Sequence, residues 1–194
     1  MMKRLNTKTA IALAAAALGL GPMAYADPPA SVDNFSLTDQ SGTTHELYSH
    51  IDAPVTVIAT QVNGDKLSQE SAKSLQELKG IFKSAEYFLL NSSETDTRAT
   101  IAAEVAAQGI TIPVLDDDHQ QVAQNLGVTQ TGEAYIIDPV GWKVLYHGPA
   151  TAAAAKNPAE PFLLFNAMVY AMSHRPMDQP GVEVSGTPIS LKAH

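Results

Sequence analysis

The chain has 194 residues, with 12 basic and 20 acidic side chains, and it contains no cysteine. Its formal net charge of −8 argues against binding to nucleic acid or to an anionic membrane surface by charge. The lack of cysteine excludes catalysis through a cysteine thiolate and excludes disulfide bonds, so stability has to come from packing.

Residues 1–26 have the features of a secretory signal peptide. Three basic residues precede an apolar run from Ile11 to Leu20, and Ala24-Tyr25-Ala26 forms an A-x-A cleavage site. The apolar run is shorter than the roughly 20 residues of a membrane-spanning helix. We therefore expect export to the periplasm, with no transmembrane segment in the mature chain. Because the three basic residues are removed, the mature chain is more acidic still.

The remaining length suits a single domain, which we assign to residues 27–174. Phe35 and Leu37 alternate with polar residues, and together with a polar turn they predict a β-hairpin over residues 34–47. The apolar stretch from Val55 to Ala59 predicts the first central strand.

Two helices and a strand are expected next. Apolar residues recur at intervals of three and four from Ser68 to Ala85, which predicts an amphipathic helix with Ser68 in its first turn. The segment from Tyr87 to Leu90 predicts a second central strand. Asp96 is expected to cap the following helix, and Gly109 to end it in a left-handed conformation.

A further half-sheet is predicted after this helix. It comprises a strand at residues 112–115, an acidic turn, a helix carrying Val122, Ala123 and Leu126, and strands at residues 134–137 and 143–146. The lone Trp142 is assigned to the last of these strands. The pattern predicts a mixed sheet with helices on both faces.

This order of elements resembles the thioredoxin-fold redoxins, including their peroxiredoxin-like and thiol-disulfide branches. Redoxins open with a similar F-x-L-x-D-x-x-G hairpin, and the segments VAQNLGV, YIID and VLYHG resemble their C-terminal half. The resemblance implies an α/β, thioredoxin-like three-layer fold. It also implies that the reactive cysteine of the family corresponds to a position at or near Val62.

Two further family features are replaced. Thr131-Gly132-Glu133 aligns with a T-P-E segment whose proline is cis in the family, and Gly186-Thr187-Pro188-Ile189 aligns with a G-C-P-I segment. A cis peptide bond before a residue other than proline costs about 2.5–4 kcal/mol, so the cis geometry is expected to be lost at Gly132. The resemblance implies that both members of an ancestral cysteine pair were replaced.

The C-terminal region consists of a helix and an extended tail. Asn157-Pro158-Ala159-Glu160 is a strong helix-start signal, and the following helix runs from Pro161 to about Ser173. This helix is apolar around more of its circumference than one contact requires, so it is either deeply buried or partly faces a partner. Residues 175–194 are expected to form an irregular Pro/Gly-rich tail.

No catalytic, cofactor-binding or metal-binding residue is assigned. Asp116-Asp117-Asp118 could form a metal cluster, but consecutive acids before a helix are more typical of capping. His45 and His50 have no ligand spacing, and a copper carrier of the Sco type needs the missing cysteines. The remaining histidines are expected to be solvated or to cap helices: His119, His147, His174 and His194.

The expected function is that of a non-catalytic accessory or assembly subunit of an exported complex. In size, export and lack of cofactor motifs, the chain resembles the small third subunit of the membrane-bound quinohaemoprotein alcohol dehydrogenases of acetic acid bacteria. That resemblance implies two protein partners, a pyrroloquinoline quinone (PQQ) dehydrogenase subunit and a cytochrome c subunit. The alternative is a stand-alone periplasmic protein that binds a metal or ligand in the vacated redoxin groove. A hydrolase or isomerase has no constellation of residues to support it.

Overall fold

The computed structural model describes residues 29–157, 163–177 and 181–192. The predicted signal peptide and most of the helix-start signal at 157–160 lie outside these ranges. None of the helices in the described ranges is long and apolar enough to cross a membrane.

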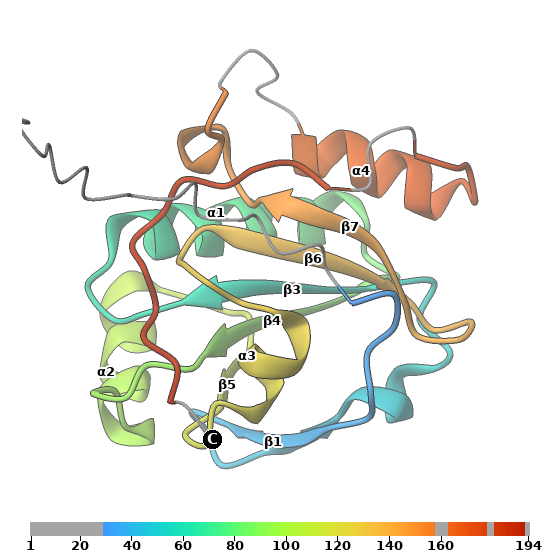
Figure 1. Ribbon diagram of the computed structural model, residues 1–194. Coiled ribbons are helices and arrows are strands. Elements are labelled where there is room, and N and C mark those ends of the chain that lie inside the picture. Colours follow the sequence, from blue (N-terminus) through green and yellow to red (C-terminus); the bar gives the residue numbers. More distant parts are fainter. Residues whose placement is uncertain (1–28, 158–162, 178–180, 193–194) are drawn as a thin grey trace, which may run out of the picture.

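A seven-stranded mixed sheet forms the centre of the domain (Figure 1). Strands β3, β4 and β5 are parallel to one another, and all other neighbours pair antiparallel. The order across the sheet is β2 (Thr44–Glu46), β1 (Ser36–Asp39), β5 (Val114–Asp116), β4 (Glu86–Asn91), β3 (Thr56–Gln61), β6 (Glu133–Asp138) and β7 (Lys143–Pro149).

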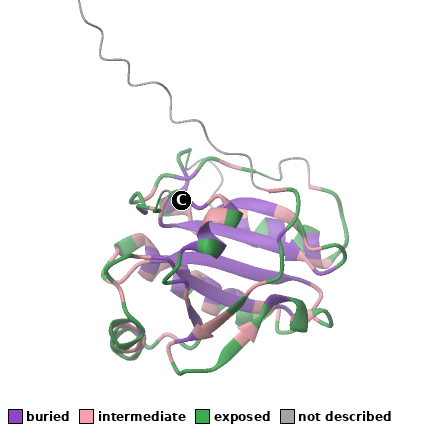
Figure 2. Cartoon of the chain, turned by 60° about the horizontal axis from the view of Figure 1, so that its bottom comes forward, coloured by how far each residue is buried: buried purple, intermediate pink, exposed green. Residues whose placement is uncertain are grey.

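Helices cover both faces of the sheet, and each face has its own apolar core. The helices are α1 (Lys66–Ile81), α2 (Arg98–Gln108), α3 (Gln121–Leu126) and α4 (Leu163–Met172), with short 3-10 turns η1 (Leu47–His50) and η2 (Ala152–Ala154). Val57 and Ala59 of β3 belong to the core that α1, α2 and α4 cover, whereas Ile58 belongs to the core that α3 covers. This alternation along a strand produces the three layers. Strand β3 is buried along its whole length, and β4 and β6 are buried at all but one residue each (Figure 2). The predicted thioredoxin-like fold is confirmed.

The element boundaries differ from the expected ones in three places. Helix α1 begins at Lys66 and ends at Ile81 instead of extending to Ala85. Asp96 does not cap α2, because Thr97 is the N-cap and exchanges capping-box hydrogen bonds with Thr100. Trp142 is not on a strand: it lies in the β6–β7 turn with a φ of 54°, stacked on Tyr48 at 4.3 Å between ring centroids.

Helix α4 is buried on one face only, so it is not deeply buried all round, and a partner on its other face stays a prediction. One face is buried against the sheet and carries Leu164, Ala167, Met168 and Ala171. The opposite face exposes three large apolar side chains, Phe165, Val169 and Tyr170. The helix is therefore a packing element on one side and an uncovered apolar surface on the other.

The C-terminal segment, residues 181–192, lies against the domain. It crosses above β7 and descends on the side where the arrows of β3 and β4 end (Figure 1). Isolated bridges join it to the body of the fold at His147↔Gly181, Ala155↔Val184 and Gln130↔Pro188. It therefore reaches the place where the redoxin resemblance puts the reactive cysteine.

Candidate functional site: a redoxin site without its thiol

The site lies where β3 ends and α1 begins. Val62 follows β3 directly, and its side chain is half-buried against the core on the α3 side. Its backbone amide donates a hydrogen bond of 3.0 Å to the Ser68 hydroxyl in the first turn of α1. The prediction that Ser68 is a first-turn residue is therefore confirmed.

Asp65 caps the N-terminus of α1. One carboxylate oxygen accepts hydrogen bonds from the backbone amide of Ser68 at 2.8 Å and from its hydroxyl at 3.0 Å. Partial burial alone would raise the pKa of Asp65, but hydrogen bonds from Ser68, Thr187 and Thr131 outweigh it and hold the pKa below its usual value. The negative charge that the positive end of this helix favours is thus a carboxylate of the chain itself.

The segment before β6 forms the second wall of the site. The Thr60 hydroxyl donates to the carbonyl of Gln130 at 3.0 Å and accepts from the amide of Glu133 at 3.1 Å, which fixes this segment to the end of β3. Between them lies Gly132, with a φ of +79°. Proline cannot adopt that angle, and no peptide bond in the described residues is cis. The expected loss of the cis geometry is confirmed.

Thr187 of the C-terminal segment supplies the third wall. Its hydroxyl donates to the second carboxylate oxygen of Asp65 at 2.8 Å, and its amide donates to the Thr131 hydroxyl at 3.0 Å. Val62, Thr131 and Thr187 line one cavity of about 230 Å³. The structure thus brings together the positions that the resemblance associates with two cysteines and a proline loop.

A polar network beside the site was not predicted. The Asn91 side-chain amide donates to Gln61 Oε1 at 2.7 Å and to Asp96 Oδ2 at 2.8 Å, and the same Asp96 oxygen accepts from the amide of Asn63 at 2.9 Å. Gln61 and Asn91 are register partners at the ends of the parallel strands β3 and β4. The network could have been predicted from the sequence, because Gln61 and Asn91 are polar residues that follow the apolar residues of two predicted strands.

A second buried cluster joins β6, β7 and the preceding loop. Glu133 accepts from the Thr129 hydroxyl at 2.6 Å and from the Tyr135 hydroxyl at 2.8 Å. His147 stacks on Tyr135 with 4.4 Å between ring centroids, and its Nε2 atom lies 3.6 Å from Glu133 Oε2. Because His147 is only 2% exposed, the expectation that it is solvated or caps a helix is wrong.

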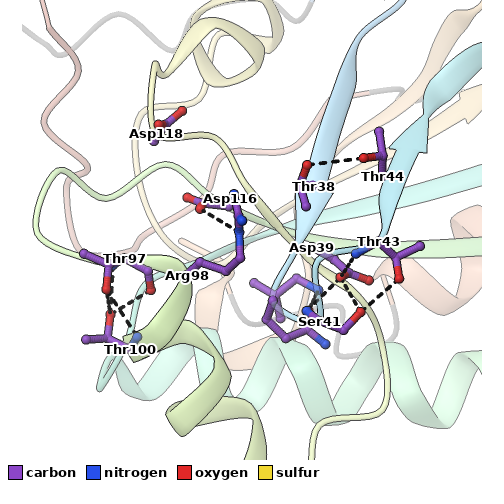
Figure 3. Close-up of polar contacts among 12 residues, drawn as sticks. Thr38, Asp39, Ser41, Thr43, Thr44, Thr97, Arg98, Thr100, Asp116 and Asp118 are labelled. Carbon is purple, nitrogen blue, oxygen red and sulfur yellow. Dashed lines mark hydrogen bonds and ion pairs between the residues drawn. The ribbon is translucent and has the colours of Figure 1, made fainter.

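The acidic turn acts mainly as a helix cap. Asp117 accepts hydrogen bonds from the amides of Val122 and Ala123 at the start of α3, at 3.2 and 2.9 Å. Burial raises the pKa of Asp117 in spite of these bonds. Asp116 turns instead toward Arg98, 3.6 Å away, and Asp118 points away from both (Figure 3). The described part of the chain holds no group of three or more residues suited to a metal ion.

The two N-terminal histidines pack the β1–β2 hairpin and η1 against Phe88 of β4. His45 Nε2 lies 2.9 Å from Asp39 Oδ2, and Asp39 also accepts bonds from Ser41 and Thr43 in the hairpin turn (Figure 3). The rings of His45 and His50 each lie 5.2 Å from the ring of Phe88. Their contacts are those of packing and turn-stabilising residues.

Helix α1 follows β3 in the chain, and the antiparallel pair β6–β7 lies on the side of β3 away from β4. This mixed sheet defines a thioredoxin-like protein of the redoxin class. The sequence matches the AhpC/TSA family over residues 29–146, and the chain belongs to that family. It differs from a redoxin enzyme at the decisive point, because it has no cysteine. A search of curated proteins finds no match.

Solved structures support the same fold. A hypothetical protein from Sinorhizobium meliloti 1021 is 21% identical with a TM-score of 0.73, over 87% of this chain and 97% of its own. The peroxidoxin BcpB from Mycobacterium tuberculosis is 18% identical with a TM-score of 0.60, over 75% and 96%. A putative thiol:disulfide interchange protein DsbE from Chlorobium tepidum is 16% identical with a TM-score of 0.63, over 75% and 98%. At these identities the likeness shows the fold.

Proposed function

We propose that this redoxin-family protein is a non-catalytic accessory or assembly subunit of an exported, periplasmic complex. The observation that carries the proposal is an uncovered apolar surface on α1 and α4. Of the seven exposed large apolar side chains among the described residues, four lie there: Ile81, Phe165, Val169 and Tyr170. Exposed apolar side chains gathered on one surface are typical of protein contact sites.

A groove between the two helices adds to this surface. It has a volume of about 570 Å³, and Leu78 and Ile81 of α1 face Leu164 and Phe165 of α4 across it. Within α4, from Leu163 to Met172, there is no charged residue. Glu77 is the one charged residue among those that line the groove, so a protein partner that docks there desolvates few charged groups.

The specific complex we propose is the membrane-bound alcohol dehydrogenase of acetic acid bacteria. In that assignment the chain stabilises or matures the dehydrogenase subunit that carries PQQ, next to a cytochrome c subunit. The quinone and the haem are then bound by the partners, and this chain holds no cofactor of its own. The support for this assignment is the resemblance in size, signal peptide and lack of cofactor motifs.

The test is recovery of the intact protein from its own cell envelope in mild detergent, without crosslinker, followed by identification of co-purifying proteins. We expect the dehydrogenase and cytochrome subunits to be recovered together with this chain. Ile81→Asp, on the apolar surface, is expected to release them. Val140→Asp is the matched control, because Val140 is 77% exposed in the β6–β7 turn and Ile81 is 60% exposed. Elution of the wild-type chain alone at its monomer mass under several conditions would refute the proposal.

The competing function is that of a stand-alone binding protein that uses the vacated groove. The cavity of about 230 Å³ next to Val62 and Thr187 favours it. Titration of the purified chain with copper, zinc and small thiols separates the two functions, because submicromolar binding by the isolated chain favours this one.

A further inference from the structure

The C-terminal segment pairs with the body of the protein as an added strand does. The amide of Thr131 donates to the carbonyl of Thr187 at 2.9 Å, and the amide of Ile189 donates to the carbonyl of Thr129 at 2.9 Å. The central residues of the two segments, Gln130 and Pro188, form an antiparallel bridge. Residues 129–131 thus act as a short edge that accepts an extended peptide.

Glutamine side chains extend this recognition along the backbone of the segment. Gln130 donates to the carbonyl of Val184 at 3.0 Å and accepts from the amide of Gly186 at 2.9 Å. Gln120 donates to the carbonyl of Ser190 at 2.9 Å and accepts from the amide of Lys192 at 2.8 Å. Each glutamine satisfies one carbonyl and one amide of the bound backbone, so these contacts recognise an extended peptide whatever its side chains.

Selectivity comes from three positions of the segment. Val184 and Ile189 are its buried apolar residues, at 7% and 9% exposure. At Gly186 an added Cβ would collide with the carbonyl oxygen of Thr131, so that position requires glycine. The most selective part of the site therefore fits the pattern apolar-x-Gly-x-x-apolar in extended conformation.

We propose that residues 129–131, with Gln120 and Gln130, form a peptide-binding site whose resident ligand is the chain's own residues 181–192. An extended segment of a partner protein with a glycine three residues before a β-branched apolar residue competes with this internal ligand. The site is distinct from the α1–α4 surface and does not depend on which complex the chain serves. The C-terminal segment is then an autoinhibitory contact, because the site is available only when it detaches.

The test uses the full-length chain with Gly186→Ala, which displaces the internal ligand by collision with Thr131. Gly80→Ala is the matched control, because a Cβ there meets no atom within 4 Å and the residue lies on α1. The probe is a fluorescent peptide with the sequence of residues 181–192, and its binding is measured by anisotropy. A second probe carries alanine at the position of Gly186.

We expect Gly186→Ala to keep the circular dichroism spectrum of the wild type. It should bind the first probe at least about tenfold more tightly than the wild type or Gly80→Ala does. The reason is that the tethered C-terminal segment competes with the probe and lowers the apparent affinity of the closed site. The alanine probe should not bind. A folded Gly186→Ala that binds neither probe, or binds both equally, would overturn the proposal.

If Gly186→Ala does not fold, Thr187→Val tests the proposal instead, because it removes only the hydrogen bond from the Thr187 hydroxyl to Asp65. It should speed hydrogen exchange of the Ile189 amide and strengthen probe binding, and no change in either overturns the proposal.

Discussion

Asp65 connects the N-terminus of α1 to the C-terminal segment, so its removal should weaken two parts of the fold together. Asp65→Ala removes the N-cap of α1, an interaction that typically contributes about 1 kcal/mol. It also removes the hydrogen bonds from the hydroxyls of Ser68 and Thr187, each of which contributes about 0.5–1.5 kcal/mol net. We expect a loss of about 2–4 kcal/mol in the free energy of unfolding.

Urea unfolding followed by circular dichroism measures this loss, as a fall of about 1–2 M in the midpoint for an m-value of about 2 kcal/mol/M. Thr187→Val alone should cost about 1 kcal/mol. The double variant should cost about 1 kcal/mol less than the sum of the two single variants, because both remove the same hydrogen bond. Asp65→Asn is the control that keeps a capping side chain.

The pH dependence gives an independent check on the same residue. Because the pKa of Asp65 is lowered in the folded chain, its stabilising effect is complete above its usual pKa and is lost as the pH falls through the lowered value. Wild type should therefore lose stability relative to Asp65→Asn on acidification through this window. An Asp65→Ala variant within about 0.5 kcal/mol of wild type, or strict additivity with Thr187→Val, would refute the reasoning.

Four other changes have definite expected outcomes. Asp117→Ala should destabilise by about 2–4 kcal/mol in urea unfolding, because it leaves buried donors of Val122, Ala123 and Ser92 without their acceptor. Asp117→Asn should gain stability relative to wild type as the pH rises through the raised pKa of Asp117, since only wild type acquires a buried charge there, and equal pH profiles would contradict this. Tyr135→Phe should cost about 1.5–3 kcal/mol by thermal and urea unfolding, because its hydroxyl donates to the buried Glu133 carboxylate, and a change below about 0.5 kcal/mol would count against that bond. Gly132→Ala should cost about 1–3 kcal/mol more than Gly64→Ala, since both glycines have positive φ but only at 132 does the added Cβ lie 2.8 Å from another atom, Ala154 Cβ.

The central strands and helices could be predicted because the periodicity of their apolar side chains decides whether each segment forms a strand or a helix. Val57, Ile58 and Ala59 alternate between two apolar cores, and α1 places Ala72, Leu75 and Leu78 on one face. Local patterns of this kind do not depend on partners distant in sequence. The layer architecture followed from them.

The errors lie where a distant residue decides the outcome. Asp96 and Thr97 are both good N-cap residues, and Thr97 takes the cap while Asp96 accepts from Asn63 and Asn91. Position 147 sits on an edge strand, where a histidine is normally exposed. Its ring is buried against Tyr135 and Glu133, and the C-terminal segment pairs with its backbone through Gly181. That segment has no periodicity, so its path could not be predicted from the sequence.

At the N-terminus of α1, where the redoxin resemblance puts the reactive cysteine, the polar groups are paired within the chain. A helix N-terminus favours a negative charge, and here the carboxylate of Asp65 supplies it, while the Val62 amide is satisfied by Ser68. Thr187 then uses the remaining oxygen of Asp65 to fix the C-terminal segment over the site. The Val62 amide and both carboxylate oxygens of Asp65 are therefore engaged with other parts of the chain. The N-terminus of α1 thus serves as a structural contact that joins the helix to the C-terminal segment.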